Sequence, residues 1–144
     1  PRDTMWLFSH TGINNVNIDV ALEAKKKGMQ VIVFGSASEA EGKKTRHSSG
    51  KNIFEIADIV VDTCAPIEDA SVTIKNHVDK IGPVSTMAFI TCVWMTITTV
   101  AEILVDRGVK LFIHHSHNAP GAVDSKDRLD EAVPAYKRRL TGVE

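Results

Sequence analysis

The fold of this chain is decided by the stretch Thr4-Met-Trp-Leu-Phe-Ser-His-Thr-Gly-Ile-Asn14 and the residues after it. The apolar run 4–8 predicts a β-strand, and apolar side chains at helical spacing predict an amphipathic helix over 18–27 that stops at Gly28. The loop between them, 9–14, combines hydroxyl groups with a glycine. A helix N-terminus attracts negative charge, and glycine lets the backbone approach a phosphate closely. The stretch therefore predicts a strand–loop–helix unit whose loop binds a phosphate.

Strands alternating with helices continue along the chain. The predicted strands are mainly apolar runs, which suit a parallel sheet covered on both faces. They cover residues 4–8, 30–34, 58–62 and 110–114. Two later helices are predicted over 83–106, ending before Gly108, and over 126–140, with Pro134 as a break or kink. We therefore expect an α/β fold with three layers, in which an open parallel sheet lies between helices.

The segments between these elements are mostly polar. Residues 35–52 are predicted to form a long loop, 53–57 a short helical turn and 71–74 a short edge strand. Ligands of an open parallel sheet bind beyond the carboxyl ends of its strands. We expect the loops that follow the predicted strands to converge on one edge; they begin at residues 9, 35, 63 and 115.

Length, charge and cysteine content narrow the function classes. The 144 residues suffice for one domain with a real core, and the net charge of −1 gives no broad field for binding nucleic acid or an anionic membrane. Cys64 and Cys92 lack C-x-x-C spacing, which disfavours a disulfide scaffold or zinc ribbon and fits a reducing cytoplasm. The uncharged, threonine-containing segment 84–101 favours a buried or subunit-interface helix over a membrane span.

Several motifs resemble the sugar isomerase (SIS) domain family. Residues 9–14 are similar to the family's Ser-x-Ser-Gly-x-Thr loop, and Ala24-Lys25, Gly28 and 31–36 are similar to the sequence that follows that loop. Further motifs resemble an uncharacterised bacterial branch of the family; they are Arg46-His-Ser-Ser-Gly-Lys51, Ala57-Asp-Ile-Val-Val-Asp62, Gly82-Pro-Val-Ser-Thr86 and Ser116-His-Asn118. The resemblance covers nearly the whole chain and implies the flavodoxin-like SIS fold.

The resemblance also implies what this chain lacks. The chain corresponds to the C-terminal portion of the SIS fold, without the N-terminal helices and an earlier strand whose loop supplies another phosphate-contacting hydroxyl. Asn14 stands where the family pattern has threonine, and Val16 stands where many isomerases carry glutamate. The nearest carboxylate is Asp19, one turn later. The resemblance therefore implies phosphate binding, whereas the glutamate of the isomerases has no counterpart at its position in this sequence.

Candidate phosphosugar-binding residues lie in the predicted loops. Hydroxyl, amide and basic side chains supply hydrogen bonds and charge to a phosphate. Our candidates are Ser9, Thr11, Gly12, Asn14, Ser36, Ser38, Arg46, Ser48, Ser49, Lys51, His117 and Asn118. The alternative is purely structural: Asn14 or Asn15 would cap the helix, the serines would lie in ordinary turns, and the basic loop would be solvated.

Candidate residues for proton transfer are His47, Glu68 and Asp69. Aldose–ketose isomerisation needs a base that moves a proton between two carbons, and histidine titrates near neutrality. Asp19 and Glu102 are further carboxylates for this role, against the alternative of acidic surface residues. A metal site at His114, His115 and His117 is disfavoured, because no recognisable ligand spacing accompanies them.

The function implied by the resemblance is binding of a phosphorylated sugar or amino sugar, with aldose–ketose isomerisation through an enediol and no metal or organic cofactor. A non-catalytic phosphosugar-sensing domain of a transcription regulator is one alternative. A lyase is another, because etherases acting on phosphorylated muramic acid share the fold. We expect a homodimer or homotetramer, in which the apolar segment 84–105 packs against a partner subunit.

Overall fold

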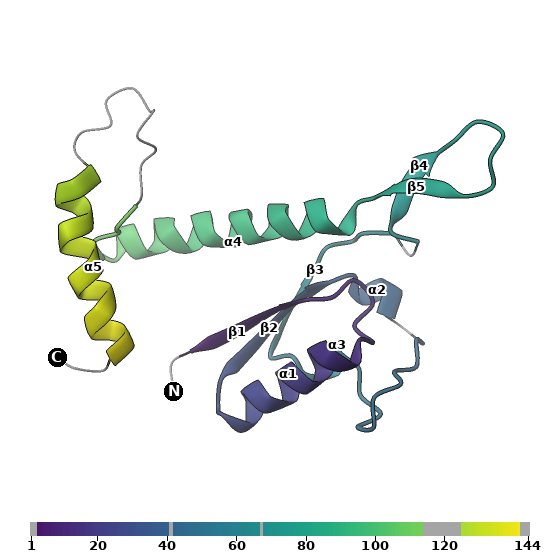
Figure 1. The fold of residues 1–144 in the computed structure, drawn as a ribbon, viewed down its shortest axis with the longest axis horizontal. Helices are drawn as coiled ribbons and strands as arrows, with labels where there is room; N and C mark the ends of the chain where they lie inside the picture. The colour runs from purple at the N-terminus through teal and green to yellow at the C-terminus, as the bar shows by residue number, and fades with distance from the viewer. Residues whose placement is uncertain (1–2, 41, 67, 114–124, 142–144) are drawn as a thin grey trace. The chain divides into compact units, whose positions relative to one another are not determined.

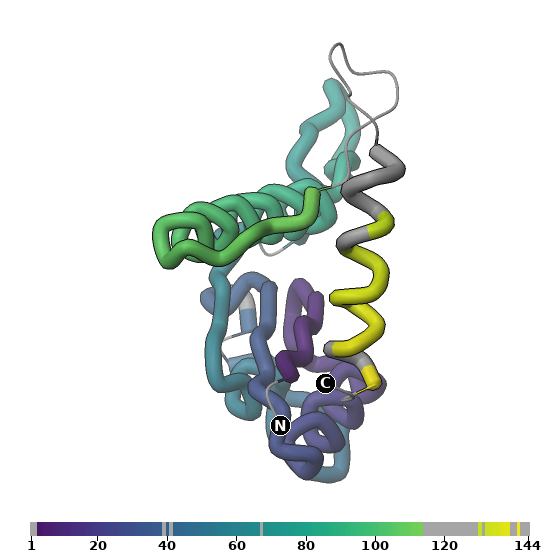
Figure 2. The backbone as a smooth tube through the Cα atoms, turned by 90° about the vertical axis from the view of Figure 1, so that its left-hand side faces the viewer, coloured from purple at the N-terminus to yellow at the C-terminus, as the bar shows by residue number. Residues whose placement is uncertain are grey.

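The computed structural model describes residues 3–40, 42–66, 68–113 and 125–141 (Figure 1). Contacts divide the chain into two compact units, Pro1–Ile97 and Thr98–Glu144. The first unit contains β1 (Thr4–Phe8), α1 (Asn15–Lys26), β2 (Gln30–Gly35), α2 (Ala37–Ala40), α3 (Ile53–Ile56), β3 (Ile59–Asp62), β4 (Ala70–Thr73) and β5 (Lys80–Pro83). Helix α4 (Ser85–Asp106) is uninterrupted (Figure 2) and begins in the first unit, whereas α5 (Ser125–Thr141) lies in the second.

The first three strands form a parallel sheet in the order β1-β2-β3. Thr4 pairs with Gln30, and Ile32 pairs with Ile59. Parallel strands need crossover connections, which α1 provides between β1 and β2, while the segment containing α2 and α3 connects β2 to β3. The predicted α/β fold with a parallel sheet is confirmed.

The core lies between the sheet and the helices α1 and α3. Apolar residues of α1 recur at helical spacing, and alternate residues of the strands point to the same face. The buried members of this cluster are Leu7, Ile18, Ala21, Ala24, Val31, Val33, Ile53 and Ile56. Burying each large side chain stabilises the fold by about 1.5–3 kcal/mol. The α1 crossover is therefore fixed against the sheet, which fixes the loop that precedes it.

Aromatic residues occupy the opposite face of the sheet. Phe34 stacks on Phe8 with ring centroids 5.0 Å apart, and Trp6 lies 5.2 Å from Phe34. Phe89 of α4 meets Phe8 edge-on at 5.6 Å. Phe8 is nevertheless 40% exposed and Ile59 43% exposed, so this face is less covered than the one under α1.

The segment before α4 differs from the sequence prediction. A strand was expected at 71–74 and is found as β4, but it pairs antiparallel with β5 in a separate two-stranded sheet. We predicted a helix from residue 83, whereas Pro83 ends β5 and the helix begins at Ser85. Proline suits both a strand end and a first helical turn, which is why the sequence did not distinguish them. The short helix α2 was also missed, inside the predicted long loop.

The apolar helix α4 is largely exposed. Among its described residues only Ser85 is buried, while Trp94 is 61% and Met95 64% exposed. By length and composition alone the helix could cross a membrane. Burial of the helix against the described residues, one of the two alternatives expected for the segment, is therefore not observed, and contact with a partner subunit stays a prediction.

The C-terminal predictions had mixed outcomes. Residues 110–113 form no strand, so the predicted fourth strand is wrong over these positions, and His114 lies outside the described residues. A strand needs a neighbour for its ladder of hydrogen bonds, and no described strand pairs with this segment. The predicted helix over 126–140 is confirmed as α5, which continues through Pro134.

Candidate functional site

The loops after β1, β2 and β3 meet at the carboxyl edge of the sheet, as predicted. The Ser36 N–H donates to the carbonyl of His10 at 3.1 Å, and the Thr63 N–H donates to the carbonyl of Gly35 at 2.9 Å. The Ser36 hydroxyl is fully buried and donates to the Ala65 carbonyl at 2.7 Å. Ser36 therefore joins the loops to each other. The predicted site residues His117 and Asn118, with His115, lie outside the described residues.

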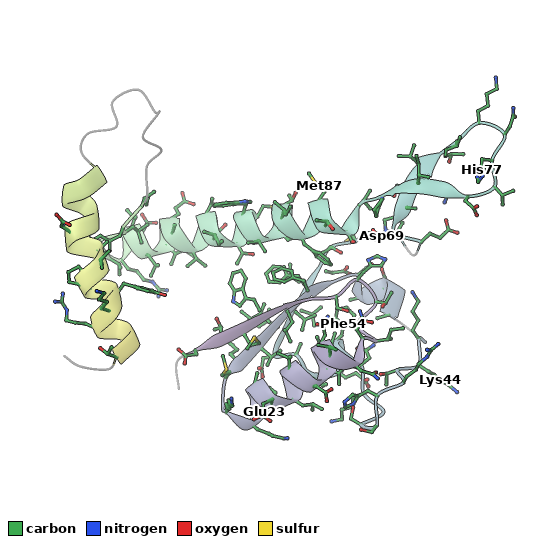
Figure 3. The ribbon with its side chains drawn as sticks, viewed as in Figure 1. Glu23, Lys44, Phe54, Asp69, His77 and Met87 are labelled. Atoms are coloured by element: carbon green, nitrogen blue, oxygen red, sulfur yellow. The ribbon has the colours of Figure 1, made fainter. Side chains whose placement is uncertain are left out.

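Gly12 sets the path of the loop between β1 and α1. Its φ is +72°, and a Cβ at this position would lie 2.4 Å from the ring of Phe54, a residue of α3 labelled in Figure 3. The Gly12 N–H donates to the Ser9 hydroxyl at 3.1 Å, and its carbonyl accepts from the Ile53 N–H at 2.9 Å. Ser9, only 4% exposed, therefore stabilises the conformation of this loop with a buried hydrogen bond.

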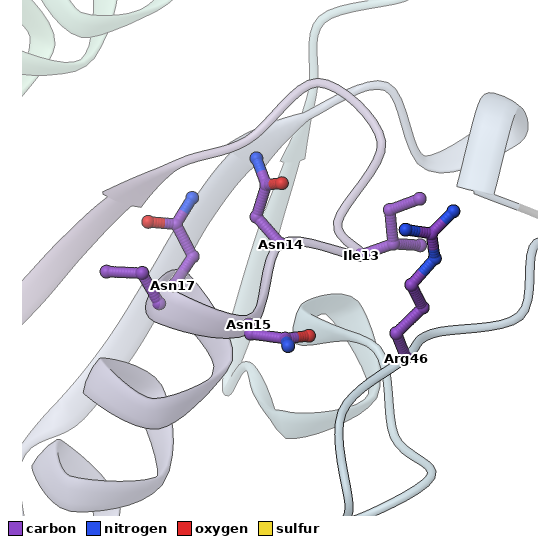
Figure 4. A pocket seen from close by; sticks show the side chains of 6 residues that line it. Ile13, Asn14, Asn15, Asn17 and Arg46 are labelled. Atoms are coloured by element: carbon purple, nitrogen blue, oxygen red, sulfur yellow. The ribbon is translucent and has the colours of Figure 1, made fainter.

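A cavity of about 510 Å³ opens at the start of α1 (Figure 4). Its described lining combines one guanidinium with three amides and two apolar side chains, from Ile13, Asn14, Asn15, Val16, Asn17 and Arg46. Arg46 extends from its own loop towards Ile13, and the Asn17 side chain donates to the Phe8 carbonyl at 3.1 Å. The cavity thus joins the first turn of α1 to a cation from a distant part of the sequence. Of the predicted binding residues, it contains Asn14 and Arg46.

The N-terminus of α1 has no side-chain cap. Asn14 occupies the N-cap position but its side chain makes no capping hydrogen bond, and the first turn contains no acidic residue. The structural alternative, in which Asn14 only caps the helix, therefore lacks the bond it requires. Since the first N–H groups of a helix have no partner within the helix, they remain available to a ligand beside the cavity.

The loop from Arg46 to Lys51 docks on α1 through His47. The imidazole, 10% exposed, places Nε2 2.9 Å from the Asp19 carboxylate and Nδ1 2.7 Å from the Ser49 hydroxyl. The Lys51 N–H donates to the same hydroxyl at 3.2 Å. The ring spans 28 positions of sequence to reach Asp19, so sequence spacing gave no signal for this pair.

The two acidic candidates lie at the base of the β4–β5 hairpin. Asp69, labelled in Figure 3, accepts hydrogen bonds from Ser85 N–H at 2.7 Å, Ser85 Oγ–H at 2.9 Å and Val84 N–H at 3.0 Å. Burial opposes ionisation, but these bonds outweigh it and lower the pKa of Asp69, with His10 nearby adding to the effect. The Glu68 carboxylate pairs with Lys80 at 3.0 Å. A lowered pKa makes Asp69 a weaker general base.

A second cavity, of about 640 Å³, lies beside α2 and the end of β3. Predicted site residue Ser38 lines it, together with Lys43, Glu55 and Asp62. The Asp62 carboxylate accepts from the N–H groups of Ala37 at 3.2 Å and Cys64 at 2.9 Å. Two carboxylates make this cavity less suited to a phosphate dianion than the one at α1.

The remaining predicted residues are not part of the described lining of the α1 cavity. Thr11 is partly buried in the loop before α1, whereas Ser48, Ser49 and Lys51 are exposed in the loop after Arg46. Asn15, Asn17 and Asp19 are the residues that the sequence did not select as contacts. Their position in the first turns of α1 was the available signal. In the described part of the chain, no three His, Cys, Asp or Glu side chains are grouped to hold a metal ion.

Comparison with known proteins identifies relatives. Residues 1–36 match the SIS domain family. A UPF0309 protein of Shouchella clausii is 34% identical over 91% of this chain and 52% of its own length. UPF0309 proteins of Caldanaerobacter subterraneus and Oceanobacillus iheyensis are 31% and 33% identical over 93% and 90% of this chain, and 54% and 52% of theirs.

The chain spans about half the length of the curated relatives it matches. The match in residues 1–36 covers β1, the glycine loop, α1 and β2, which are the elements around the α1 cavity. The resemblance to the SIS domain family that the motifs predicted is therefore confirmed over residues 1–36.

Proposed function

We propose that the cavity at the start of α1 binds the phosphate of a phosphorylated sugar or amino sugar. The observation that carries this proposal is the uncapped N-terminus of α1 beside the guanidinium of Arg46. An anion there gains from the helix dipole, from free N–H groups and from a charge-assisted hydrogen bond. The SIS domain match supports a phosphosugar as the source of that anion.

The cavity supplies separate groups for the two parts of such a ligand. Arg46 and the N–H groups of the first turn of α1 bind the phosphate. The side-chain amides of Asn14 and Asn15 donate to or accept from sugar hydroxyls. Gly12 sets the position of the loop before the helix, since a Cβ there would clash with Phe54.

The finer proposal is aldose–ketose isomerisation of the bound sugar phosphate. This reaction requires a group that moves a proton between neighbouring carbons. Of the candidates, Asp69 is engaged at the start of α4 and Glu68 with Lys80, whereas His47 follows Arg46 directly in the chain. A sensor domain without chemistry is the second candidate, supported by the same cavity. Self-association through the exposed surface of α4 is proposed for either function.

A thermal-shift screen tests binding. We expect one or more phosphorylated hexoses, amino sugars or heptoses to raise the Tm, whereas the corresponding free sugars do not, because a ligand that binds only the folded state stabilises it by mass action. Inorganic phosphate serves as the control for the anion alone. Equal shifts with phosphorylated and free sugars, or none with any phosphosugar, would count against the proposal.

Deuterium incorporation separates the isomerase from the sensor. A sugar phosphate incubated with an isomerase in D₂O exchanges the hydrogen at C1 or C2, which NMR detects even when the equilibrium favours the starting sugar. A sensor binds the same ligand and leaves these hydrogens in place. Binding without exchange for every sugar phosphate that shifts the Tm would favour the sensor.

A further inference from the structure

We propose that Asp19, His47 and Ser49 form a proton relay in which the Ser49 hydroxyl exchanges a proton with a bound sugar phosphate. This inference rests on the proposed function and adds the groups that would move the proton. Asp19 and Ser49 gain these roles from the hydrogen bonds around His47. The sequence offered Asp19 only as one of several carboxylates and Ser49 only as a phosphate-binding candidate.

Hydrogen-bond chemistry fixes the tautomer of the His47 ring. A carboxylate only accepts, so Nε2, 2.9 Å from Asp19 Oδ1, carries the hydrogen. A backbone N–H only donates, so Nδ1, 3.1 Å from the Ser49 nitrogen, is the accepting atom. In the neutral ring Nδ1 is therefore the basic nitrogen, and Asp19 holds the ring in this state. Asp19 is thus a positioning residue for His47.

The Ser49 hydroxyl is polarised from both sides. It lies 2.7 Å from the accepting Nδ1, so its hydrogen points to the imidazole. Its oxygen accepts from the Lys51 N–H at 3.2 Å, which stabilises negative charge developing on it. A hydroxyl bonded to a base that is oriented by a third group is the usual arrangement of an activated serine. Ser49 is exposed and the imidazole is not, so the serine is the end of the relay that a ligand reaches.

The relay lies beside the cavity at the start of α1. Asp19 follows Asn15 by one helical turn, and His47 follows Arg46, and both of these neighbours line the cavity. The contact between Asp19 and His47 fixes the loop carrying Arg46 to α1. The charged groups within four positions of His47 in its own loop are Lys43, Lys44, Arg46 and Lys51. The group facing the imidazole from α1 is the carboxylate of Asp19.

The proton step balances without a cofactor. Ser49 Oγ takes the hydrogen from C2 of the open-chain aldose while its own proton passes to His47 Nδ1. The electron pair of the C2–H bond forms the C1=C2 bond and moves the carbonyl pair onto O1. The proton on O2 then moves to O1. The negative charge left on O2 forms the new C2=O2 carbonyl, and the electron pair of the C1=C2 bond takes a proton at C1 from the Ser49 hydroxyl. Ser49 in turn recovers its own proton from His47 Nδ1. Asp19 stabilises the imidazolium present between these steps.

NMR of the His47 ring nitrogens tests the geometry without a substrate. We expect the neutral ring to show the Nε2–H tautomer, and Asp19→Ala to shift the ring towards the Nδ1–H tautomer, because it removes the acceptor of the Nε2–H group. Asp19→Glu should restore the Nε2–H tautomer. Glu23→Gln is the matched control, since Glu23 is one turn further along α1 and pairs with Lys26. The same tautomer in Asp19→Ala and wild type would overturn the relay.

Deuterium exchange tests the chemistry, with fructose 6-phosphate and glucosamine 6-phosphate as probes. Ser49→Ala should slow exchange at C1 or C2 at least about 100-fold, the usual size of one acid–base contribution, while the sugar phosphate still raises the Tm of the variant. Ser71→Ala, which removes an exposed hydroxyl from β4, should exchange at the wild-type rate. Exchange in Ser49→Ala at that same rate, or binding without exchange by wild type, would overturn the relay and leave phosphosugar binding intact. No binding by wild type would overturn the proposed function itself.

Discussion

The N-termini of α1 and α4 differ in what satisfies their first N–H groups. At α4 the Asp69 carboxylate accepts from the N–H groups of Val84 and Ser85, so the helix begins on a negative charge from its own chain. At α1 the N-cap Asn14 makes no side-chain bond, and the nearby charge is the positive Arg46. A helix dipole attracts an anion in both places. The N-terminus of α4 is therefore satisfied by the Asp69 carboxylate, whereas the N-terminus of α1 can bind an anion from solution.

The shorter helices support the same distinction. The start of α2 receives the Asp62 carboxylate, and α3 begins with a capping box made by Asn52 and Glu55. Side-chain caps are the ordinary way to satisfy a helix start. Among the starts of α1 to α4, α1 is the one at which no side-chain cap is formed. This contrast is the main reason for assigning the ligand to the α1 cavity.

The largest expected effect comes from displacing the loop before α1. Gly12→Ala forces a side chain into a left-handed conformation and against the Phe54 ring, so we expect it to lower the free energy of unfolding by about 3 kcal/mol and to abolish phosphosugar binding. Gly50→Ala is the matched control, because its φ of +68° is similar but its Cβ would meet open space. It should cost only about 1 kcal/mol. Urea unfolding measures both, and equal losses would contradict the packing argument.

Removing the cation should weaken binding at α1 and leave the fold intact. For Arg46→Ala we expect a 10- to 100-fold rise in the Kd for a phosphosugar, corresponding to about 1.5–3 kcal/mol for a charge-assisted hydrogen bond. Lys44→Ala, an exposed cation two positions away, is the control and should change the Kd by less than about threefold. Calorimetric titration measures the affinities. Similar losses in both variants would indicate a diffuse charge effect instead of a built site.

Removing the negative charge of Asp69 should destabilise the start of α4. We expect Asp69→Asn to lower the free energy of unfolding by about 1–2 kcal/mol, the contribution of a negative charge at a partly buried helix N-terminus. Because the pKa of the folded Asp69 lies below its ordinary value, its stabilisation is present above the unfolded pKa and disappears as the pH falls through the folded pKa. The difference between variant and wild type should therefore shrink below about pH 4. Urea unfolding at pH 7 and at pH 3 checks this, and a pH-independent difference would refute it.

The smallest expected effect comes from a substitution that gives the start of α1 a negative charge like the one at the start of α4. Asn14→Asp places a negative charge at the open helix start, so we expect a gain of about 0.3–1 kcal/mol in stability together with weaker binding of a phosphosugar. Asn14→Ala separates the two effects, because it removes the amide without adding charge. Thermal unfolding and calorimetric titration report on them. Stronger binding in Asn14→Asp would show that the anion does not bind at this helix start.

Local sequence patterns predicted much of the sheet and its loops. The apolar runs gave β1, β2 and β3 nearly to the residue, and Gly28 marked the end of α1. The pattern failed at 110–113, because an apolar run becomes a strand only when a neighbouring strand is there to pair with it. It also failed at β5, whose partner β4 lies beyond a turn with no strong sequence signal. The sequence also predicted that the loops after these strands meet at one edge of the sheet, but it did not predict which residues contact each other there.

The sequence by itself determined the parallel α/β arrangement and the loop of hydroxyl groups and a glycine before α1. These features depend on residues that are neighbours in the chain. Only the tertiary structure decided that Arg46 lines the α1 cavity, that Asp19 hydrogen-bonds to His47 and that Asp69 accepts hydrogen bonds from the start of α4. Such contacts join residues far apart in sequence, and their distances follow from how the crossovers pack on the sheet.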